Sequence, residues 1–527
     1  MANRLAATTL AALLIAAWLT IVFAWPIRFW ATGDDYVYLS LAHAIHFEFA
    51  LHNKIGPDPA LLNHPGLPFY FASWLALRAA AFSSRSNEII QSALAGPDNF
   101  FLASRIIAGL ITGAAVGSAW LLLRGVTAWW RMLALLAFFA TTSASFRYGL
   151  VVLGNETFAL PLAVLLFWAV DLLAEAPPRA TWPWLLLGSV AALGYTVKLL
   201  YLDLLVAAAA VAAVDVWWEF RGFGMTAIME LARRATLAAL AFLALAGLLL
   251  VAVLGFGGLA GLLAFHASIF THSGKYGSGE IGLVSTVEVG QALNWIAETA
   301  LPYLLAIVAA GLFVSLLEKS KARTLDRRTV LWTTAALAAI LSAVAAVLKH
   351  FGSHYLVSIS AILPFALLPI LEQRRVRWIA AAAVVAGLGV TVLQAAKAFS
   401  QESRTAAEIV EDEIKISAMP LMPNEARLWT YRIPSEKFAA AFVATYSGLP
   451  SLAATLADSS LQDFSSYSLL NRPYRYIVLD RDYFPDADTV RKTTNSLEPT
   501  QGVMVHIAPD DQINVLKRTI VVEKRTP

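Results

Sequence analysis

The stretch ATLAALAFLALAGLLLVAVLGFG, residues 235–257, decides the fold class because it contains no charged side chain. An α-helix needs about 20 consecutive apolar residues to cross the hydrocarbon core of a bilayer. Similar runs recur at about 5–25, 100–123, 132–150, 157–174, 183–196, 199–218, 291–316, 329–348, 355–371 and 378–396. The sequence therefore predicts an all-α polytopic membrane domain with about 11 transmembrane helices.

Charged residues divide the 527-residue chain near residue 396. Residues 397–527 contain 32 charged side chains among 131 residues, an ordinary density for a soluble protein, whereas residues 1–396 contain only 43. The C-terminal part begins with a charged helical connector at 397–415. It continues with the strand-like runs RLWTYRI, YRYIVLD, VMVHI and TIVVE and a helical run at 435–447. These alternating signals predict a small α/β domain over 397–527.

The basic residues predict which side of the membrane each loop faces. With the N-terminus inside, the inner loops hold 15 Lys and Arg residues and the outer loops hold seven, the bias expected of cytoplasmic loops. This count requires the short apolar run at 66–82 to be an interfacial helix, because a crossing there would move every later loop to the opposite side of the membrane. The first outer loop is then 26–99, the first segment is a retained anchor, and the C-terminal domain is extracytoplasmic.

Composition also narrows the classes of function. The net charge is only +3 and the basic residues lie in short loops between apolar spans, so nucleic-acid binding is not indicated. The chain has no cysteine, which excludes disulfides, thiolate zinc sites and cysteine nucleophiles. Any chemistry must come from other polar residues, and these collect at the outer ends of the predicted spans.

The first outer loop contains the adjacent carboxylates Asp34 and Asp35 in TGDDYVYLSLAHAI. Two carboxylates beside low-dielectric lipid ionise less readily than in water, and one of them can act as a general base. Alternatively, the pair caps a helix that starts near Tyr36. Later in the same loop, His64 lies in LLNHPGLPFYFASW, at the start of the interfacial run.

Charged residues also mark the third to sixth predicted spans. Arg147 lies within an apolar span, where an arginine is costly and normally faces a polar cavity or a partner. Glu156 follows Asn155 at the start of the next span, where helix capping would also explain both residues. Lys198 lies at the outer hinge between the fifth and sixth spans. It can hold a phosphate as a point charge, or instead pair with Asp203 or extend to the surface.

Two later outer loops contribute histidines. The loop FHASIFTHSGKYGSGEIG carries His266 and His272 in a Gly-rich sequence that matches no nucleotide-binding loop. The stretch KHFGSHYLVSISAILPFALLP places His354 and Tyr355 at the outer mouth of the ninth and tenth spans. Polar groups from six separate loops thus reach one face, which indicates a single site there.

In this order the motifs resemble the GT-C superfamily of membrane glycosyltransferases, in particular the bacterial branch of aminoarabinose transferases and protein O-mannosyltransferase relatives. GDDYVYLSLA at 33–42 is similar to the family's G-D-E-x-x-Y-x-x-x-A, with Asp34 at the catalytic aspartate and Tyr38 at the tyrosine. HPGLPFY at 64–70 is similar to K-P-P-L-x-Y-W. Arg147 with Glu156 resembles the family's G-R…D, and Thr196-Val197-Lys198 resembles its T-K. His272, or alternatively His266, is similar to its loop histidine, and His354-Tyr355-Leu356 is similar to its R-Y-L-L-P.

The resemblance covers most of residues 1–395 and implies an inverting glycosyltransferase of the bacterial inner membrane. Its site would face the periplasm, and its donor would be a sugar on a polyprenyl phosphate. Asp34 would be the base, Asp35 and Glu156 would orient hydroxyl groups, and Lys198 would hold the lipid phosphate. The other implied substrate-binding residues are His64, Tyr38, Arg147, His272, His354 and Tyr355.

The implied acceptor is an envelope lipopolysaccharide, glycolipid, polysaccharide or protein. Asn63 stands where some relatives carry a metal-binding acid, so neither a metal nor another cofactor is predicted. Two other classes stay open. A lipid or sugar transporter or flippase would need ionisable or broken-helix sites near mid-membrane. A non-catalytic scaffold would serve only to hold the C-terminal domain.

Overall fold

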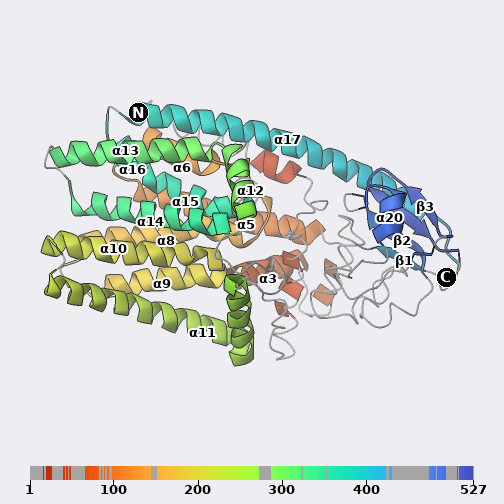
Figure 1. Ribbon diagram of the computed structural model, residues 1–527, viewed down its shortest axis with the longest axis horizontal. Coiled ribbons are helices and arrows are strands. Elements are labelled where there is room, and N and C mark those ends of the chain that lie inside the picture. Colours follow the sequence, from red (N-terminus) through yellow and green to blue (C-terminus); the bar gives the residue numbers. More distant parts are fainter. Residues whose placement is uncertain are drawn as a thin grey trace. The chain divides into compact units, whose positions relative to one another are not determined.

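The chain is mostly helical, with one small sheet near the C-terminus, as Figure 1 shows. This architecture confirms the predicted fold class, a helical membrane domain followed by a small α/β domain. The computed structural model describes residues 16, 19–25, 40–41, 43–45, 47–48, 66–81, 85, 88–89, 92–93, 98–143, 151–177, 179–222, 224–271, 286–321, 325–349, 353–374, 376–422, 426–429, 474–481, 484–493, 507–508 and 510–525.

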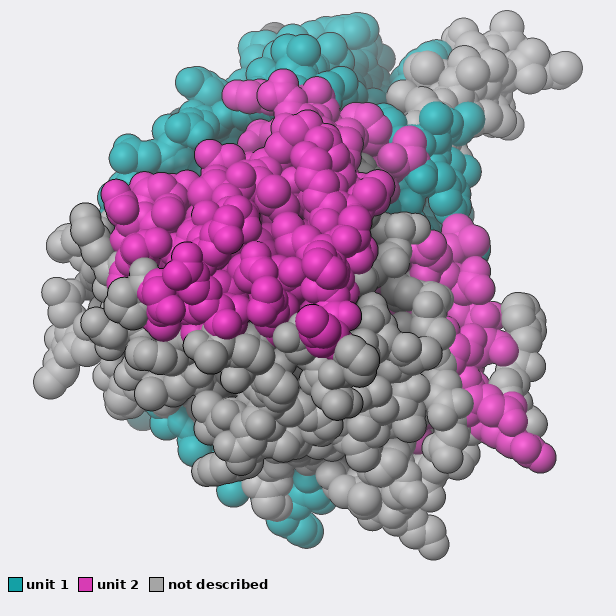
Figure 2. Space-filling model, turned by 90° about the vertical axis from the view of Figure 1, so that its right-hand side faces the viewer, with its two compact units in different colours: residues 1–23, 56–69, 105–396 teal, residues 24–55, 70–104, 397–527 magenta. Residues whose placement is uncertain are grey.

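The chain forms two compact units, which are coloured separately in Figure 2. Unit 1 comprises Met1–Phe23, Gly56–Phe69 and Arg105–Ala396. Unit 2 comprises Ala24–Ile55, Tyr70–Ser104 and Lys397–Pro527. Residues 397–527, predicted as a separate domain, therefore share a unit with most of the predicted first outer loop.

Seven helices within the described ranges are long and apolar enough to cross a membrane. They are α5 (Asp98–Leu122), α8 (Ala159–Glu175) with its preceding turn η4 (Asn155–Phe158), α10 (Asp203–Phe220) with η5 (Leu199–Leu202), α11 (Met225–Thr271) as far as Phe256, α13 (Leu301–Lys321), α14 (Arg327–Lys349) and α17 (Arg377–Ser417). Shorter apolar helices are α6 (Ala128–Phe139), α9 (Trp182–Val197) and α15 (Leu356–Ala366) with α16 (Leu368–Leu371). Each span predicted between residues 100 and 396 overlaps one of these helices. The span predicted at 132–150 is matched only by α6, which ends at Phe139. The predicted first span lies mostly outside the described residues, of which 19–24 are helical.

One predicted span, 291–316, is in fact two helices, α12 (Thr286–Ala297) and α13. The Thr299 hydroxyl donates a hydrogen bond to the Ile296 carbonyl at 2.7 Å and accepts one from the Leu301 amide at 3.2 Å. These bonds end one helix and cap the next, and Pro302 suits the first turn that follows. A local capping pattern therefore interrupts a continuous apolar run.

Helix α11 is longer than predicted and is broken at Gly255. This residue has φ 66° and ψ 176°, a left-handed conformation that favours glycine. After the break the helix runs crosswise to its first part, as α12 does (Figure 1). The sequence predicted a span ending at 257 and a loop beyond it, whereas helix continues to Thr271.

Close packing holds the helices of unit 1 together. Phe167 of α8 stacks on Phe365 of α15 with ring centroids 4.4 Å apart, and Trp332 of α14 lies 5.0 Å from Phe167. Helices α9 and α11 approach each other at Gly188, where an added Cβ would lie 2.1 Å from the Ala238 carbonyl oxygen. At Gly188 the two helices therefore leave no room for a methyl group.

Buried carboxylates bind pairs of arginines at one end of unit 1. Asp171, near the end of α8, accepts hydrogen bonds from Arg124 at 3.2 Å and from Arg328. Asp215, in the second half of α10, binds Arg234 at 2.6 Å and Arg327 at 2.7 Å. All four arginines belong to loops that were predicted to lie inside. We call this region the arginine end (Arg124, Asp171, Asp215, Arg234, Arg327 and Arg328).

In unit 2, the helical residues among 40–48 pack against α3 (Leu67–Ala81). The Glu48 carboxylate is fully buried and accepts hydrogen bonds from Trp74 and Arg78, both at 2.7 Å. The His43 ring lies 4.3 Å from the Tyr70 ring. Helix α3 has 15 residues and is therefore about 22 Å long, too short to cross a bilayer upright. Its position at the interface stays a prediction.

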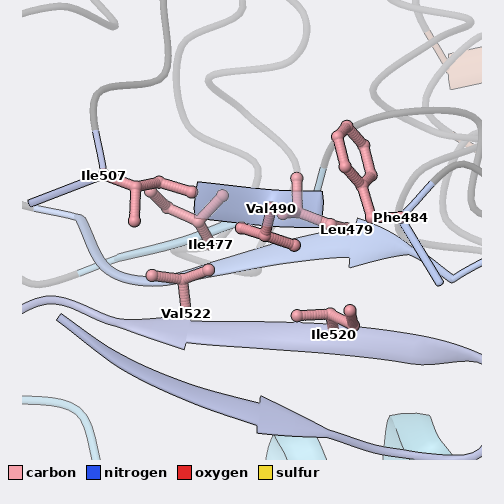
Figure 3. Close-up of a cluster of buried hydrophobic side chains, with 7 residues drawn as sticks. All are labelled: Ile477, Leu479, Phe484, Val490, Ile507, Ile520 and Val522. Atoms are coloured by element: carbon pink, nitrogen blue, oxygen red, sulfur yellow. The ribbon is translucent and has the colours of Figure 1, made fainter. Parts of the chain in front are cut away.

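The sheet of unit 2 has the strand order β1-β2-β4-β3. Strands β1 (Ala426–Trp429) and β2 (Tyr474–Asp480) are parallel, whereas β4 (Thr519–Glu523) pairs antiparallel with both β2 and β3 (Gln512–Val515). Helix α20 (Ala487–Thr493) contributes to the core, as Figure 3 shows. The buried core consists of Ile477, Leu479, Phe484, Val490, Ile507, Ile520 and Val522.

The predicted connector and three of the predicted strands are confirmed by α17, β1, β2 and β4. In VMVHI only Ile507 is described, and it lies outside the strands; the helical run at 435–447 lies outside the described residues. Helix α17 carries Asp412, whose buried carboxylate accepts hydrogen bonds from the backbone amides of residues 517, 518 and 519. The connector therefore holds the turn between β3 and β4.

Candidate functional site

Three short 3-10 turns bring the candidate site together, and each precedes a helix of unit 1. Turn η4 precedes α8, η5 precedes α10, and η6 (Ser353–Tyr355) precedes α15. Glu156, Lys198 and His354 lie on or next to these turns. They occupy the opposite end of α8 and α10 from Asp171 and Asp215, and we call it the site end. Helix N-termini carry partial positive charge, so three of them favour an anion here.

Glu156 lies at the centre of the site end, with its side chain only 2% exposed. Its Oε1 accepts a hydrogen bond from Lys198 Nζ at 2.8 Å and lies 3.9 Å from His354 Nε2. Its Oε2 has no hydrogen-bond partner among the described residues. The Thr157 hydroxyl fixes the turn, since it accepts from the Gly154 amide at 3.1 Å and donates to a carbonyl oxygen.

Lys198 is positioned by the break between α9 and η5. Its backbone is extended, with φ −162° and ψ 146°, and its amide still donates to the Gly194 carbonyl at 3.1 Å. An added Cβ at Gly194 would lie 2.7 Å from Leu204, so glycine permits this close turn. The side chain is 3% exposed and its Nζ lies 4.4 Å from the centre of the Tyr355 ring. The lysine is therefore buried on Glu156 rather than extended to the surface.

Turn η6 adds His354 and Tyr355 to the same place. The two rings lie 4.1 Å apart, and the His354 side chain is 8% exposed. Four residues selected from the sequence, separated by up to 199 positions, thus meet at the site end: Glu156, Lys198, His354 and Tyr355.

The motif that carries His64 reaches the same turn through its backbone. The Gly66 amide donates a hydrogen bond to the carbonyl of Val197, the residue before Lys198, at 3.0 Å. Gly66 has φ 51°, which a residue with a side chain would adopt only with strain. The third residue of HPGLPFY is therefore adjacent to the lysine.

Of the two candidate loop histidines, the structure describes only His266. His266 lies in the crosswise part of α11, and its Nδ1 is 3.2 Å from the hydroxyl of Tyr195 in the last turn of α9. Burial lowers the pKa of His266 to about 4, so this imidazole is neutral at pH 7. His272 lies outside the described residues, as do Asp34, Asp35, Tyr38, His64 and Arg147.

One site residue was missed from the sequence, and two others were assigned different roles. Tyr201, which is 2% exposed, donates a hydrogen bond to the Asn155 carbonyl at 3.3 Å and so joins η5 to η4. Asn155 was interpreted only as a helix cap. Asp203 was considered as a partner of Lys198, but the ion pair of this lysine is with Glu156. The spacing of Lys198, Tyr201 and Asp203 within KLLYLD was the available signal.

This arrangement can bind an anion and orient hydroxyl groups beside it. Lys198 supplies a cation in a region of low dielectric constant, where its attraction to a phosphate exceeds that in water. Glu156 supplies a fixed acceptor. Within the described ranges, no three His, Asp or Glu side chains are grouped as metal ligands would be.

No protein-family model matches the chain, and no curated protein matches it. Among solved structures, it is similar to the crystal structure of ArnT from Cupriavidus metallidurans bound to undecaprenyl phosphate. The two share 14% sequence identity, the match covers 98% of each chain, and the TM-score is 0.49. At this identity and TM-score the likeness assigns no function. We therefore derive a function from the site residues.

Proposed function

We propose that this chain is an inverting glycosyltransferase that moves a sugar from a polyprenyl phosphate to an acceptor of the cell envelope. The observation that carries the proposal is the Lys198 ammonium, buried 2.8 Å from Glu156 where three helices begin. A buried lysine at three helix N-termini suits a phosphate group that brings its own membrane anchor. The ordered motifs of residues 33–42 and 64–70 supply the rest of the proposed site.

In the proposed reaction, Asp34 takes a proton from the acceptor hydroxyl or amine. The acceptor atom attacks the anomeric carbon from the face opposite the phosphate and forms the new glycosidic bond. The bond between that carbon and the phosphate oxygen breaks, and its electron pair stays on the lipid phosphate. Lys198 stabilises this leaving group, with help from His64, His272 or His354.

The remaining proposed residues orient the substrates. Asp35 and Glu156 would hold hydroxyl groups, while Tyr38, Arg147 and Tyr355 would line the donor site. The proposed location is the bacterial inner membrane, with the N-terminus in the cytoplasm and the C-terminal domain in the periplasm. The site end then faces the periplasm, and the arginine end lies at the cytoplasmic surface, as the distribution of basic residues predicts.

Mass spectrometry of envelope glycans from cells with and without the chain identifies the transferred sugar. Transfer is then measured for purified variants that remain folded in the membrane. We expect Asp34→Asn to lower transfer by about a hundredfold or more, the usual contribution of a general base. We expect Lys198→Met to abolish it, because the leaving phosphate loses its cation. Lys415→Met is the control. This lysine is exposed, and among the described residues its ion pair is with the nearby Glu411 carboxylate.

Three outcomes would contradict the proposal. A folded Asp34→Asn variant with near-normal transfer would remove the proposed base. A chain that moves a lipid or sugar across vesicles without any covalent change would be a transporter. An envelope that changes only when residues 397–527 are deleted, and never when Asp34 or Lys198 is replaced, would indicate a scaffold.

A further inference from the structure

Three side-chain oxygens at the site end are buried, and within the described part of the chain they accept no hydrogen bond. They are Asn155 Oδ1, Glu156 Oε2 and Asp203 Oδ1. The three residues are 4%, 2% and 2% exposed. A buried acceptor without a donor destabilises the folded state, so such atoms are few in native proteins. Three of them at the site end are therefore available to donors that no described residue supplies.

These oxygens belong to one cluster. Asn155 and Glu156 are neighbours on η4, and Asp203 is the first residue of α10, directly after η5. Tyr201 joins the two turns through its hydrogen bond to the Asn155 carbonyl. We call Asn155, Glu156 and Asp203 the acceptor cluster.

The chemistry of the cluster limits what it can bind. A carboxylate oxygen and an amide oxygen accept hydrogen bonds, so these particular atoms repel a phosphate oxygen. The charge of Glu156 is already neutralised at Oε1 by Lys198, at 2.8 Å, which leaves Oε2 available to a neutral donor. The Asp203 side chain likewise presents a buried oxygen, Oδ1, to which no described residue donates. Groups that carry O–H and no charge fit these acceptors best.

We propose that the acceptor cluster binds hydroxyl groups of the transferred sugar, and that Asn155 and Asp203 determine which sugar is accepted. This inference rests on the proposed function and divides the site into two parts. Lys198 and Tyr355 hold the lipid phosphate on one side of Glu156. The acceptor cluster holds a neutral sugar on the other. Glu156 contacts both parts, with Oε1 toward the lysine and Oε2 toward the sugar.

The test compares bare and glycosylated lipid on the whole chain in nanodiscs. The bare lipid is undecaprenyl phosphate, and the glycosylated forms are the same lipid carrying glucose, mannose or an amino sugar. We expect the unmodified chain to bind a glycosylated form more tightly than the bare lipid. Asn155→Leu should reduce this preference about tenfold, because it removes a buried acceptor of the sugar hydroxyls. Asp203→Asn should reduce it by a smaller factor, because an amide oxygen accepts more weakly than a carboxylate. Both should leave the affinity for bare lipid within about twofold.

Thr333→Val is the matched control for these variants. Thr333 of α14 is also buried and its hydroxyl also has no partner within the described residues, but it lies two turns from the start of α14, beside the arginine end. Its replacement should leave both affinities unchanged. Thermal unfolding of each variant establishes that the chain is folded. If Asn155→Leu does not fold, Asp203→Asn serves as the test, because asparagine has nearly the same shape as aspartate.

The outcomes separate this inference from the proposed function. If folded variants keep the full preference for glycosylated lipid, or if the unmodified chain has none, the acceptor cluster does not bind the sugar. In that case Lys198-dependent binding of bare undecaprenyl phosphate would still support the proposed function. A stronger preference for an amino sugar than for both hexoses would overturn the assignment to hydroxyl groups. Failure to bind any of the lipids would contradict the proposed function itself.

Discussion

Replacing Lys198 with methionine leaves the Glu156 carboxylate buried without its cation. The two charged atoms are 2.8 Å apart and both side chains are at most 3% exposed. At an effective dielectric constant of about 20, their attraction is about 6 kcal/mol. Because the lysine no longer has to be desolvated, we expect a net loss of about 3–5 kcal/mol in unfolding free energy.

A double-variant cycle separates the ion pair from the phosphate contact. Lys198→Met combined with Glu156→Gln removes both charges, so we expect a stability within about 1 kcal/mol of the unmodified chain. The coupling energy between the two positions should then be about 3 kcal/mol or more. Sugar transfer should stay absent in the double variant, because a stable site without a cation cannot stabilise the leaving phosphate.

The assay is reversible unfolding in mixed micelles, followed by far-ultraviolet circular dichroism as the denaturing detergent is increased. The control is Lys415→Met, which removes an exposed partner of Glu411 at 2.9 Å, and which we expect to cost less than about 1 kcal/mol. A loss at Lys198 no larger than this control would show that the pair is not buried. Near-normal transfer by the double variant would refute the role of the lysine.

Three further predictions concern packing, the C-terminal domain and pH. Gly188→Ala should destabilise unit 1 by about 1–3 kcal/mol in the same assay, because its Cβ would overlap the Ala238 carbonyl; Gly117→Ala, with open space around it, should be neutral or stabilising. Asp412→Ala should destabilise the C-terminal domain by about 3 kcal/mol, since three backbone amides lose a buried charged acceptor; faster proteolysis between residues 397 and 527 would measure this, and an unchanged rate would contradict it. The pKa of His266 lies below its unfolded value of 6.5, at about 4, so folding stability should fall as the pH falls from about 6.5 to 4. His266→Gln should flatten the pH dependence in that window, and an identical pH profile would show that the imidazole is not buried.

Hydropathy predicted the membrane helices well because burial in lipid makes length and apolarity decisive. It failed where a local pattern acts within an apolar run. Thr299 caps a helix inside one predicted span, and Gly255 adopts a left-handed conformation inside another. Neither event changes the mean hydropathy of its window. Strand β3 (Gln512–Val515) was also missed, because it has only four residues. It pairs with β4 after the turn whose amides bind Asp412.

The candidate site was predicted as a set, but its internal contacts were not. Order along the chain selected Glu156, Lys198 and His354, and the structure brings these three together. The sequence suggested the nearby Asp203 as the partner of Lys198, whereas the actual partner is Glu156, 42 positions earlier. Only the packing of α8 against α9 decides between the two carboxylates. Tyr201 became evident for the same reason, through its contact with Asn155.

The arginine end has a consequence for how the helices can move. A carrier that alternates between two openings must part its helices at each membrane surface in turn. Parting them here would pull Arg124 and Arg328 from Asp171, and Arg234 and Arg327 from Asp215, at a cost of about 3–5 kcal/mol for each carboxylate left buried alone. Helices that ion pairs hold together at the arginine end can separate only at the site end, so substrates would enter and leave from that one side.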